Sequence, residues 1–121
     1  MLKLIINGDC PSKKNSRAFS FRGNRPMSFP GKHYRLWHND ALKQIATEQP
    51  LPLLENVKQV EIKVFAKTKR KSDLTNKAES VMDLLVDASI IEDDNWFIIP
   101  EVRLLFGGVD PENPRVEIKI I

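Results

Sequence analysis

Apolar residues alternate with polar ones in three segments of the chain, residues 1–7, 57–66 and 116–120. Successive side chains of a β-strand point to opposite faces of a sheet, so a period of two predicts a strand with one buried face. The pattern is clearest in 57–66, where branched apolar residues alternate with charged ones. We therefore expect these three segments to share one sheet.

Other strand-like segments are less regular. Residues 17–29 (RAFSFRGNRPMSF) predict two short strands around a Gly23-Asn24 turn, a basic hairpin. Residues 96–99 and 101–106 predict two further strands, and Pro100 between them favours a bulge or an edge position. The glycine pair that follows predicts a long turn before the last strand.

Helical spacing of apolar residues occurs in residues 33–48, where Trp37 is expected to pack in the core. We expect Trp96, at the start of a predicted strand, to be buried as well. His38 has no partner at metal-ligand spacing, which favours a structural or exposed position over a catalytic one.

A second helix is predicted from Ser72 or Asp73, either of which is a suitable N-cap, to about Ala88. Its apolar residues fall on one half of a helical wheel. Its polar residues, Asp83 and Asp87 among them, fall on the other half, which we expect to be solvated. The order of elements predicts an α+β fold, a small mixed or antiparallel sheet with two helices packed on one face.

The length of 121 residues predicts a single domain, 1–121, that is large enough to bury a core. No apolar run approaches the roughly 20 residues of a membrane span, and the first residues lack the pattern of a signal peptide. A single cysteine, Cys10, excludes an internal disulfide and is expected to be a small apolar residue beside a loop. We expect a cytoplasmic protein.

Charge is distributed unevenly, although the net charge is only +3. Residues 67–77 carry five bases and one acid, whereas residues 78–94 carry six acids and no base. Bases hold phosphates, and carboxylates hold the divalent cations that bridge to a scissile phosphate. The pattern is typical of a metal-dependent enzyme that acts on a polyanion, and equally of two solvated surface patches.

Two acids at the ends of the second helix, Asp73 and Asp94, are candidates for one site. A helix of about 15 residues is some 22 Å long. The two carboxylates therefore meet only if residues 89–94 run back along the helix, or if a second chain supplies one of them. Taken one at a time, each acid is better explained as a cap or as part of a polar turn than as a metal ligand.

The spacing of these acids resembles a family signature. Asp73-Leu74-Thr75-Asn76, then Asp83-Leu84-Leu85, then Ile91-Glu92-Asp93-Asp94 is similar to the pattern D-L-D-N-x-x-K, D-A-L and D-D of the RusA family of Holliday junction resolvases. The spacing matches without a gap. The opening CPSKKNSR (10–17) is also similar to the proline-containing opening of that family, so the resemblance covers essentially the whole chain.

The resemblance implies a homodimeric, Mg²⁺-dependent endonuclease, with Mn²⁺ as a possible substitute. Such enzymes nick two opposing strands of a four-way DNA junction, in DNA recombination or repair of the phage and prophage type. It further implies that Asp73 and Asp94 are metal ligands and that Asp93 lies in the same site. The bases expected to hold junction phosphates are Lys13, Lys14, Arg17, Arg22, Arg25, Lys67, Lys69, Arg70, Lys71 and Lys77.

The chain departs from the signature at two positions. The second carboxylate of the pattern is Thr75 here, and its lysine is Glu79. A hydroxyl is a poorer magnesium ligand than a carboxylate. Positions 75 and 79 share a helix face, so Glu79 returns a carboxylate to nearly the same place. We favour this exchange over the loss of a metal ligand. Thr75 then either holds a metal-bound water or caps the helix, and Asn76 either bonds a ligand carboxylate or is only a polar residue of the first turn.

Two other functions stay open. A non-catalytic protein that binds junctions or structured nucleic acid would keep the basic surface and lose the metal site through Thr75. A small RNA-binding protein would also carry this charge.

Overall fold

The computed structural model describes residues 1–12, 17–22, 25–48 and 51–121. Four strands form one mixed sheet in the order β1-β6-β4-β5. β1 (Leu2–Asn7) pairs antiparallel with β6 (Arg115–Ile120), and β6 pairs antiparallel with β4 (Val60–Ala66). β5 (Val102–Val109) pairs parallel with β4 at the edge of the sheet. The predicted α+β class and mixed sheet are confirmed.

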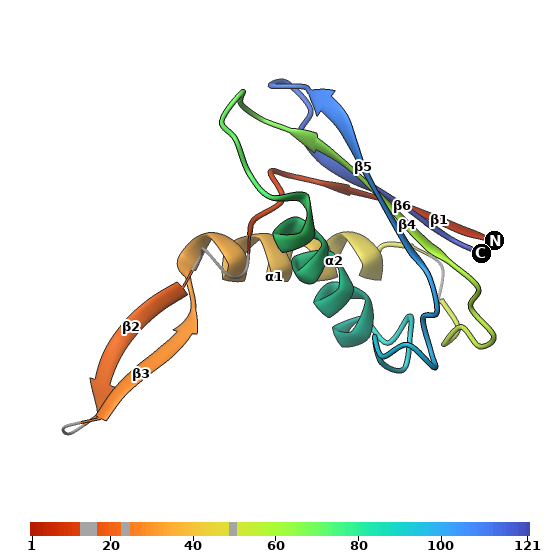
Figure 1. Ribbon diagram of the computed structural model, residues 1–121, viewed down its shortest axis with the longest axis horizontal. Helices are drawn as coiled ribbons and strands as arrows, with labels where there is room; N and C mark the ends of the chain where they lie inside the picture. Colours follow the sequence, from red (N-terminus) through yellow and green to blue (C-terminus); the bar gives the residue numbers. More distant parts are fainter. Residues whose placement is uncertain (13–16, 23–24, 49–50) are drawn as a thin grey trace.

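Two helices lie on one face of the sheet and cross each other (Figure 1). α1 (Lys32–Ala46) and α2 (Leu74–Asp87) match the predicted helices to within two residues at their starts and ends. α2 connects the parallel strands β4 and β5, which need a crossover of this kind because a short turn cannot join them. No described helix is long and apolar enough to cross a bilayer.

A separate two-stranded hairpin, β2 (Arg17–Arg22) with β3 (Arg25–Pro30), lies apart from the main sheet (Figure 1). The predicted hairpin strands are therefore confirmed. Its turn at Gly23-Asn24 lies outside the described residues, as do Lys13 and Lys14 and the side chains of the arginines in both strands.

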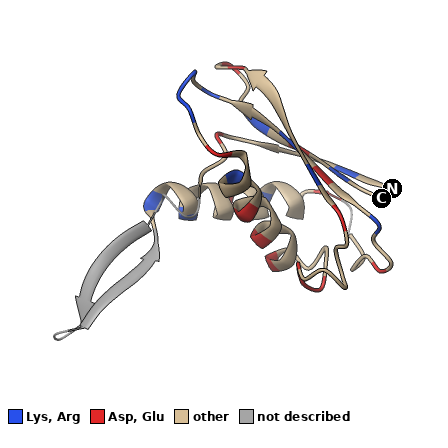
Figure 2. Ribbon diagram, in the orientation of Figure 1, with Lys and Arg blue, Asp and Glu red and all other residues tan. Residues whose placement is uncertain are grey.

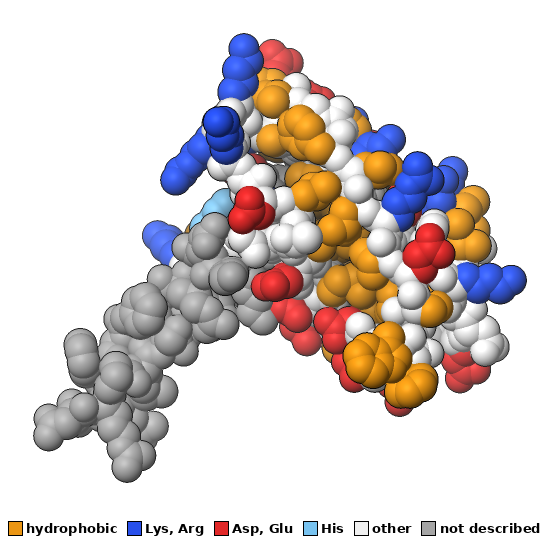
Figure 3. Space-filling model, in the orientation of Figure 1, with side chains coloured by type: hydrophobic (Ala, Val, Ile, Leu, Met, Phe, Trp, Pro, Cys, Tyr) orange, Lys and Arg blue, Asp and Glu red, His pale blue; other side chains and the backbone are white. Residues whose placement is uncertain are grey.

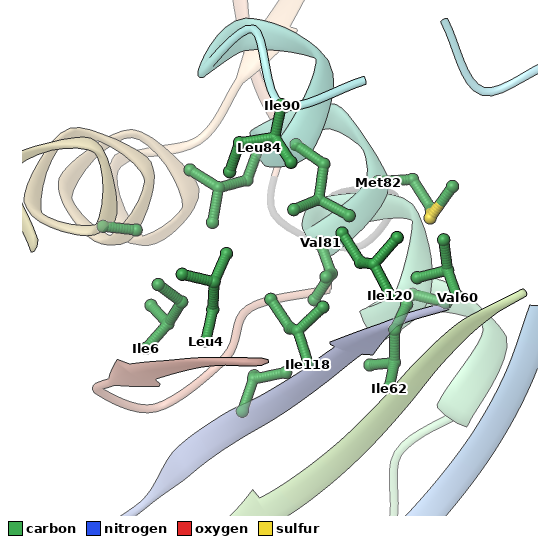
Figure 4. Packing of buried hydrophobic residues seen from close by; sticks show 14 of the residues in the cluster. Leu4, Ile6, Val60, Ile62, Val81, Met82, Leu84, Ile90, Ile118 and Ile120 are labelled. Atoms are coloured by element: carbon green, nitrogen blue, oxygen red, sulfur yellow. The ribbon is translucent and has the colours of Figure 1, made fainter. Parts of the chain in front are cut away.

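The core lies between the sheet and the helices (Figure 4). Val60 and Ile62 of β4 point inward at the period of two that the sequence predicted, and both are fully buried. Val81 and Leu84 of α2 and Trp37 of α1 cover them from the helix side. The expected burial of Trp37 is confirmed. The core thereby fixes α2 against β4.

The expected strand at 96–99 is wrong. Asn95 accepts hydrogen bonds through its side-chain oxygen from the N–H groups of Phe97 (3.0 Å) and Ile98 (3.2 Å). Its carbonyl accepts a third from Ile99 at 2.8 Å. These local bonds close a tight turn and compete with sheet pairing. Trp96 is consequently 76 % exposed, so its predicted burial is wrong too.

The glycine pair that the sequence placed in a turn lies inside β5. Gly107 is the extra residue of a bulge, because Val64 pairs with Phe106 and the next residue of β4, Phe65, pairs with Gly108. A Cβ at Gly107 would lie 2.6 Å from the ring of Phe65, and Gly108 has a φ of +120°. Both positions thus require glycine, for packing and for backbone conformation respectively.

Candidate active site

Asp73 stands at the N-cap position of α2 with extended backbone, yet its side chain makes no capping hydrogen bond. Its described side-chain partner is the amide of Asn76, at 3.5 Å from Oδ2. Asp73 is exposed and Asn76 is buried. The capping explanation of Asp73 is therefore not supported, and the carboxylate stays accessible at the start of the helix.

The segment after β1 packs against the first turns of α2. Lys77 Nζ donates to the carbonyl oxygen of Cys10 at 2.7 Å, and Ser80 Oγ donates to that of Pro11 at 2.8 Å. Lys77 is half-buried, so it is a structural residue as well as a base beside the site. Cys10 is 1 % exposed, as expected, and its burial raises the pKa of its thiol to about 12.

A cavity of about 700 Å³ opens beside Asp73. Its walls come from the segment after β1, the start of α1, the loop after β4 and the first turn of α2. Four of its side chains are basic and two are carboxylates. Figure 2 shows this basic loop leading directly into the start of α2. The ionisable side chains that line the cavity are those of Asp9, His33, Lys67, Arg70, Lys71, Asp73 and Lys77.

Sequence reasoning missed Asp9, Ser12 and His33 in this cavity. His33 Nε2 lies 3.0 Å from the carbonyl oxygen of Asp9, which requires the nitrogen to donate. Ser12 Oγ is buried and has no hydrogen-bond partner in the described part of the chain. No local pattern indicates these residues, since they are brought together across 24 positions of sequence.

Thr75 and Glu79 are both exposed and lie one turn apart on α2. The predicted exchange between these two positions requires that they share an accessible face, and their exposure is compatible with it. The role of Glu79 as a ligand remains a prediction.

Asp93 organises the turn that follows α2. Its two oxygens accept from the backbone N–H of Asp94 (2.8 Å) and from the amide of Asn95 (2.9 Å). These bonds, the first more than the second, lower the pKa of Asp93. Because both oxygens are engaged, Asp93 is less suited to ligation than its neighbour.

Asp94 has the opposite environment. Partial desolvation raises its pKa first, followed by its hydrogen bond to Asp93 and the charge of that residue, with a smaller effect of Asp83. Asp94 therefore lies within electrostatic reach of the middle of α2. Asp83 is ten residues along the helix from Asp73, about 15 Å. Asp73, at the start of the helix, is not among the groups that shift the pKa of Asp94.

The expectation that Asp83 and Asp87 form a solvated face is wrong for Asp83 and is confirmed for Asp87. Asp83 is half-buried, and its Oδ2 lies 3.5 Å from the hydroxyl of Tyr34 on α1. Asp87, with a side chain 58 % exposed, pairs with His38 Nε2 at 2.8 Å. His38 in turn stacks on Tyr34, so it has the structural role that the sequence favoured.

The candidate acids do not gather into a group of three or more ligands in the described part of one chain. Among the described residues, no three His, Cys, Asp or Glu side chains converge in a group that could hold a metal ion. Asp73 lies at one end of α2, and Asp93 and Asp94 follow the other end (Figure 2). A site of the expected ligands, Asp73, Glu79, Asp93 and Asp94, is therefore incomplete in a single chain.

A basic cleft beside an accessible carboxylate has the charge that a protein acting on nucleic acid requires. The family model of endodeoxyribonuclease RusA matches residues 10–121, and the chain belongs to this family. Comparison with curated proteins gave no matching relative. The resemblance that the sequence suggested is confirmed, and the match includes all of α2 and every residue that lines the cleft except Asp9.

Proposed function

We propose that the protein is a metal-dependent endonuclease that resolves four-way DNA junctions by paired, symmetric nicking, in DNA recombination or repair. Membership of the RusA endodeoxyribonuclease family supports DNA cleavage. The observation that carries the assignment to this chain is the basic cleft beside the exposed carboxylate of Asp73, which makes no capping hydrogen bond.

The cleft suits a DNA strand. Lys67, Arg70 and Lys71 line it from one loop and are all exposed, so their side chains can reach successive phosphates. Lys69 lies in the same loop and is exposed as well. Neutralising phosphates releases condensed counterions, which supplies most of the sequence-independent affinity for DNA. Strand binding here would present a phosphate to Asp73.

The proposed cofactor is Mg²⁺, with Mn²⁺ as an alternative. Carboxylate oxygens are the ligands that this hard cation prefers, and the candidates are Asp73, Asp94, Glu79 and Asp93. A bound cation supplies charge that polarises the scissile phosphate. Since these carboxylates do not converge within one chain, the proposed enzyme needs a second subunit to complete each site.

A homodimer also suits the substrate. A four-way junction has two equivalent strands, and a two-fold dimer presents one site to each. A dimer with two equivalent active sites would therefore nick the two equivalent strands at symmetric positions.

Glu79 is proposed to replace the carboxylate that Thr75 lacks. Comparison of Glu79→Ala with Asp73→Asn tests this exchange. If Glu79→Ala nicks junctions at the wild-type rate while Asp73→Asn is inactive, Glu79 is not a ligand and the exchange is rejected.

A binding protein without catalysis is the second candidate, favoured by Thr75 at a ligand position. A synthetic four-way junction distinguishes the two functions when binding is measured in EDTA and cleavage is measured after Mg²⁺ is added. Mg²⁺-dependent nicks, with four-way DNA preferred over duplex DNA and RNA, are the expected result. Tight binding without cleavage would establish the binding protein instead.

A further inference from the structure

A second hollow, of about 350 Å³, adjoins the basic cleft at the loop between β4 and α2. Its apolar wall comes from both parallel strands and from the start of α2, and its rim comes from the basic loop. Figure 3 shows hydrophobic side chains at this end of β5 beside the Lys and Arg side chains of the loop. The apolar side chains on which the argument depends are Val64, Leu74, Phe106 and Val109.

Phe106 is the largest of these apolar side chains, and it is 62 % exposed. It pairs with the buried Val64 in the parallel register, so the two side chains are on the same face of the sheet, the one that the helices cover. The exposure of Phe106 shows that no described element covers that face at this end of β5. The ring is therefore open to a ligand that enters the hollow.

The bulge in β5 brings a second apolar side chain to the hollow. In a regular strand Phe106 and Gly108 would share a face and Val109 would point to the other one. Because Gly107 is the extra residue, Val109 instead pairs with Ala66 and joins Phe106 on the helix side. The bulge thus gives the hollow two apolar side chains of one strand.

One loop forms part of both cavities. Arg70 and Lys71 line the cleft and the hollow alike. Ser72 lines both as well, Asp73 lines the cleft, and Leu74 lines the hollow. A nucleotide has a matching division, since its charged phosphate is joined to a flat base with two apolar faces. A strand whose phosphates contact the loop therefore carries a base within reach of the hollow.

The hollow suits a nucleobase in size and in chemistry. Cavities that hold small ligands measure about 300–1,000 Å³ and have mostly apolar walls with a few polar groups. Aromatic side chains bind single-stranded nucleic acid by stacking on bases, each of which has a π-face. The hydroxyls of Thr68 and Ser72 also line the hollow and can bond to the edge of a base. A base held inside a duplex cannot enter, so the ligand is an unstacked base.

We propose that the hollow binds an unstacked nucleobase against the ring of Phe106 and thereby holds the adjoining phosphate beside Asp73. This base site rests on the proposed nuclease function. It adds a physical reason for a preference for branched DNA over duplex DNA. The basic side chains attract any strand, whereas the hollow accepts only a strand with a base outside the stack, as at a branch point. Phe106 is thus a specificity-determining residue and takes no part in the chemical step.

Abasic junctions test this contact. Binding of a four-way junction is measured in EDTA, with an abasic residue placed in turn at each position around the branch point on two opposing strands. At one such position, loss of the base should weaken binding by the wild type about 5-fold or more, the lower end of the range for stacking on an aromatic side chain. Phe106→Ala should weaken binding of the intact junction by a similar factor and lose no further affinity for that abasic junction.

Two further variants control for the loss of a side chain. Phe106→Trp restores an aromatic ring and should bind both junctions as the wild type does. Ile5→Ala, on β1 at the opposite edge of the sheet, is the control matched in exposure, at 59 %, and should also bind as the wild type does. Since Phe106→Ala removes no charge, its slope of log affinity against log salt should equal that of the wild type.

Several results would overturn the base site. Wild-type affinity of Phe106→Ala for the intact junction is one. Another is an abasic effect that is as large in Phe106→Ala as in the wild type at every position. If that second result comes with a change in the sedimenting mass of Phe106→Ala, protein covers the hollow instead of a base. In these cases the wild type still binds and nicks junctions, so the nuclease proposal stands. If the wild type binds no junction, the nuclease proposal and the base site both fail.

Discussion

Lys77 Nζ donates a hydrogen bond of 2.7 Å to the carbonyl oxygen of Cys10 and so ties the segment after β1 to the helix that begins at Asp73. Hydrogen bonds from charged donors stabilise more than neutral ones. We expect Lys77→Met, which keeps the aliphatic stem, to lower the free energy of unfolding by about 1–2 kcal/mol. Urea denaturation measures this change, and the exposed control Lys3→Met should stay near wild type. Equal effects of the two substitutions would show that the bond to Cys10 contributes nothing.

Two large apolar residues, Ile62 and Phe97, differ in burial and should therefore differ in their contribution to stability. Ile62 is fully buried in β4, and Phe97 is 87 % exposed. Ile62→Ala should cost about 2–5 kcal/mol because it leaves a cavity in the core. Phe97→Ala removes a side chain that is already in solvent, so it should leave the free energy of unfolding within about 0.5 kcal/mol of wild type in urea denaturation. Similar losses of stability in the two variants would contradict this difference in burial.

Substitution of Arg70 tests whether the cleft binds phosphates. Arg70 lines the cavity and makes no ion pair among the described residues. Arg70→Ala should weaken binding of a four-way junction in EDTA. Its plot of log affinity against log salt should be shallower than that of the wild type by about 0.9. Lys3→Ala, near the N-terminus, is the matched loss of one charge and should leave the slope unchanged. An unchanged slope for Arg70→Ala would place the DNA elsewhere.

The thiol of Cys10 gives a pH-dependent test of the packing around it. Burial raises its pKa from 9.0 to about 12. The folded state therefore keeps the neutral thiol at pH values where the unfolded chain ionises. Stability should be unaffected below pH 9 and should fall as pH rises from about 9 toward 12, more in the wild type than in Cys10→Ala. Denaturant midpoints at pH 8 and pH 10.5 measure the difference, and parallel pH profiles would contradict the burial.

Much of the fold was predictable because local patterns agree with the packing. The alternation in β4 corresponds to its buried face, and the apolar half of α2 is buried as well, together with Asn76 and Ser80 of the polar half. The two wrong predictions of secondary structure have local causes that the periodicity of apolar residues does not reveal. Asn95 closes a turn where apolar residues suggested a strand, and the ring of Phe65 selects glycine inside a strand where a turn was expected.

The candidate site was predictable in its charges but not in its geometry. The spacing of Asp73 and Asp94 indicated the family, which the match over residues 10–121 confirmed. Spacing could not show which acids face each other, since that depends on how α2 and the turn after it pack. The contact of Asp83 with Tyr34 likewise arises from helix packing across 49 positions, for which no sequence pattern exists.

Asp73 is the residue on which the proposed chemistry depends most. It is exposed and its side chain makes no capping bond, so Asp73→Asn should leave the free energy of unfolding within about 0.5 kcal/mol of wild type. It should also bind a four-way junction in EDTA with nearly wild-type affinity. Cleavage is the property that should be lost.

The most direct measurement follows nicks on both opposing strands of a four-way junction carrying two labels, with Mg²⁺ and with EDTA, for wild type and Asp73→Asn. We expect the wild type to nick the two strands at symmetric positions in Mg²⁺ only, and Asp73→Asn to bind without nicking. Equal cleavage by the two proteins, or cleavage by the wild type in EDTA, would contradict a metal-dependent nuclease centred on Asp73.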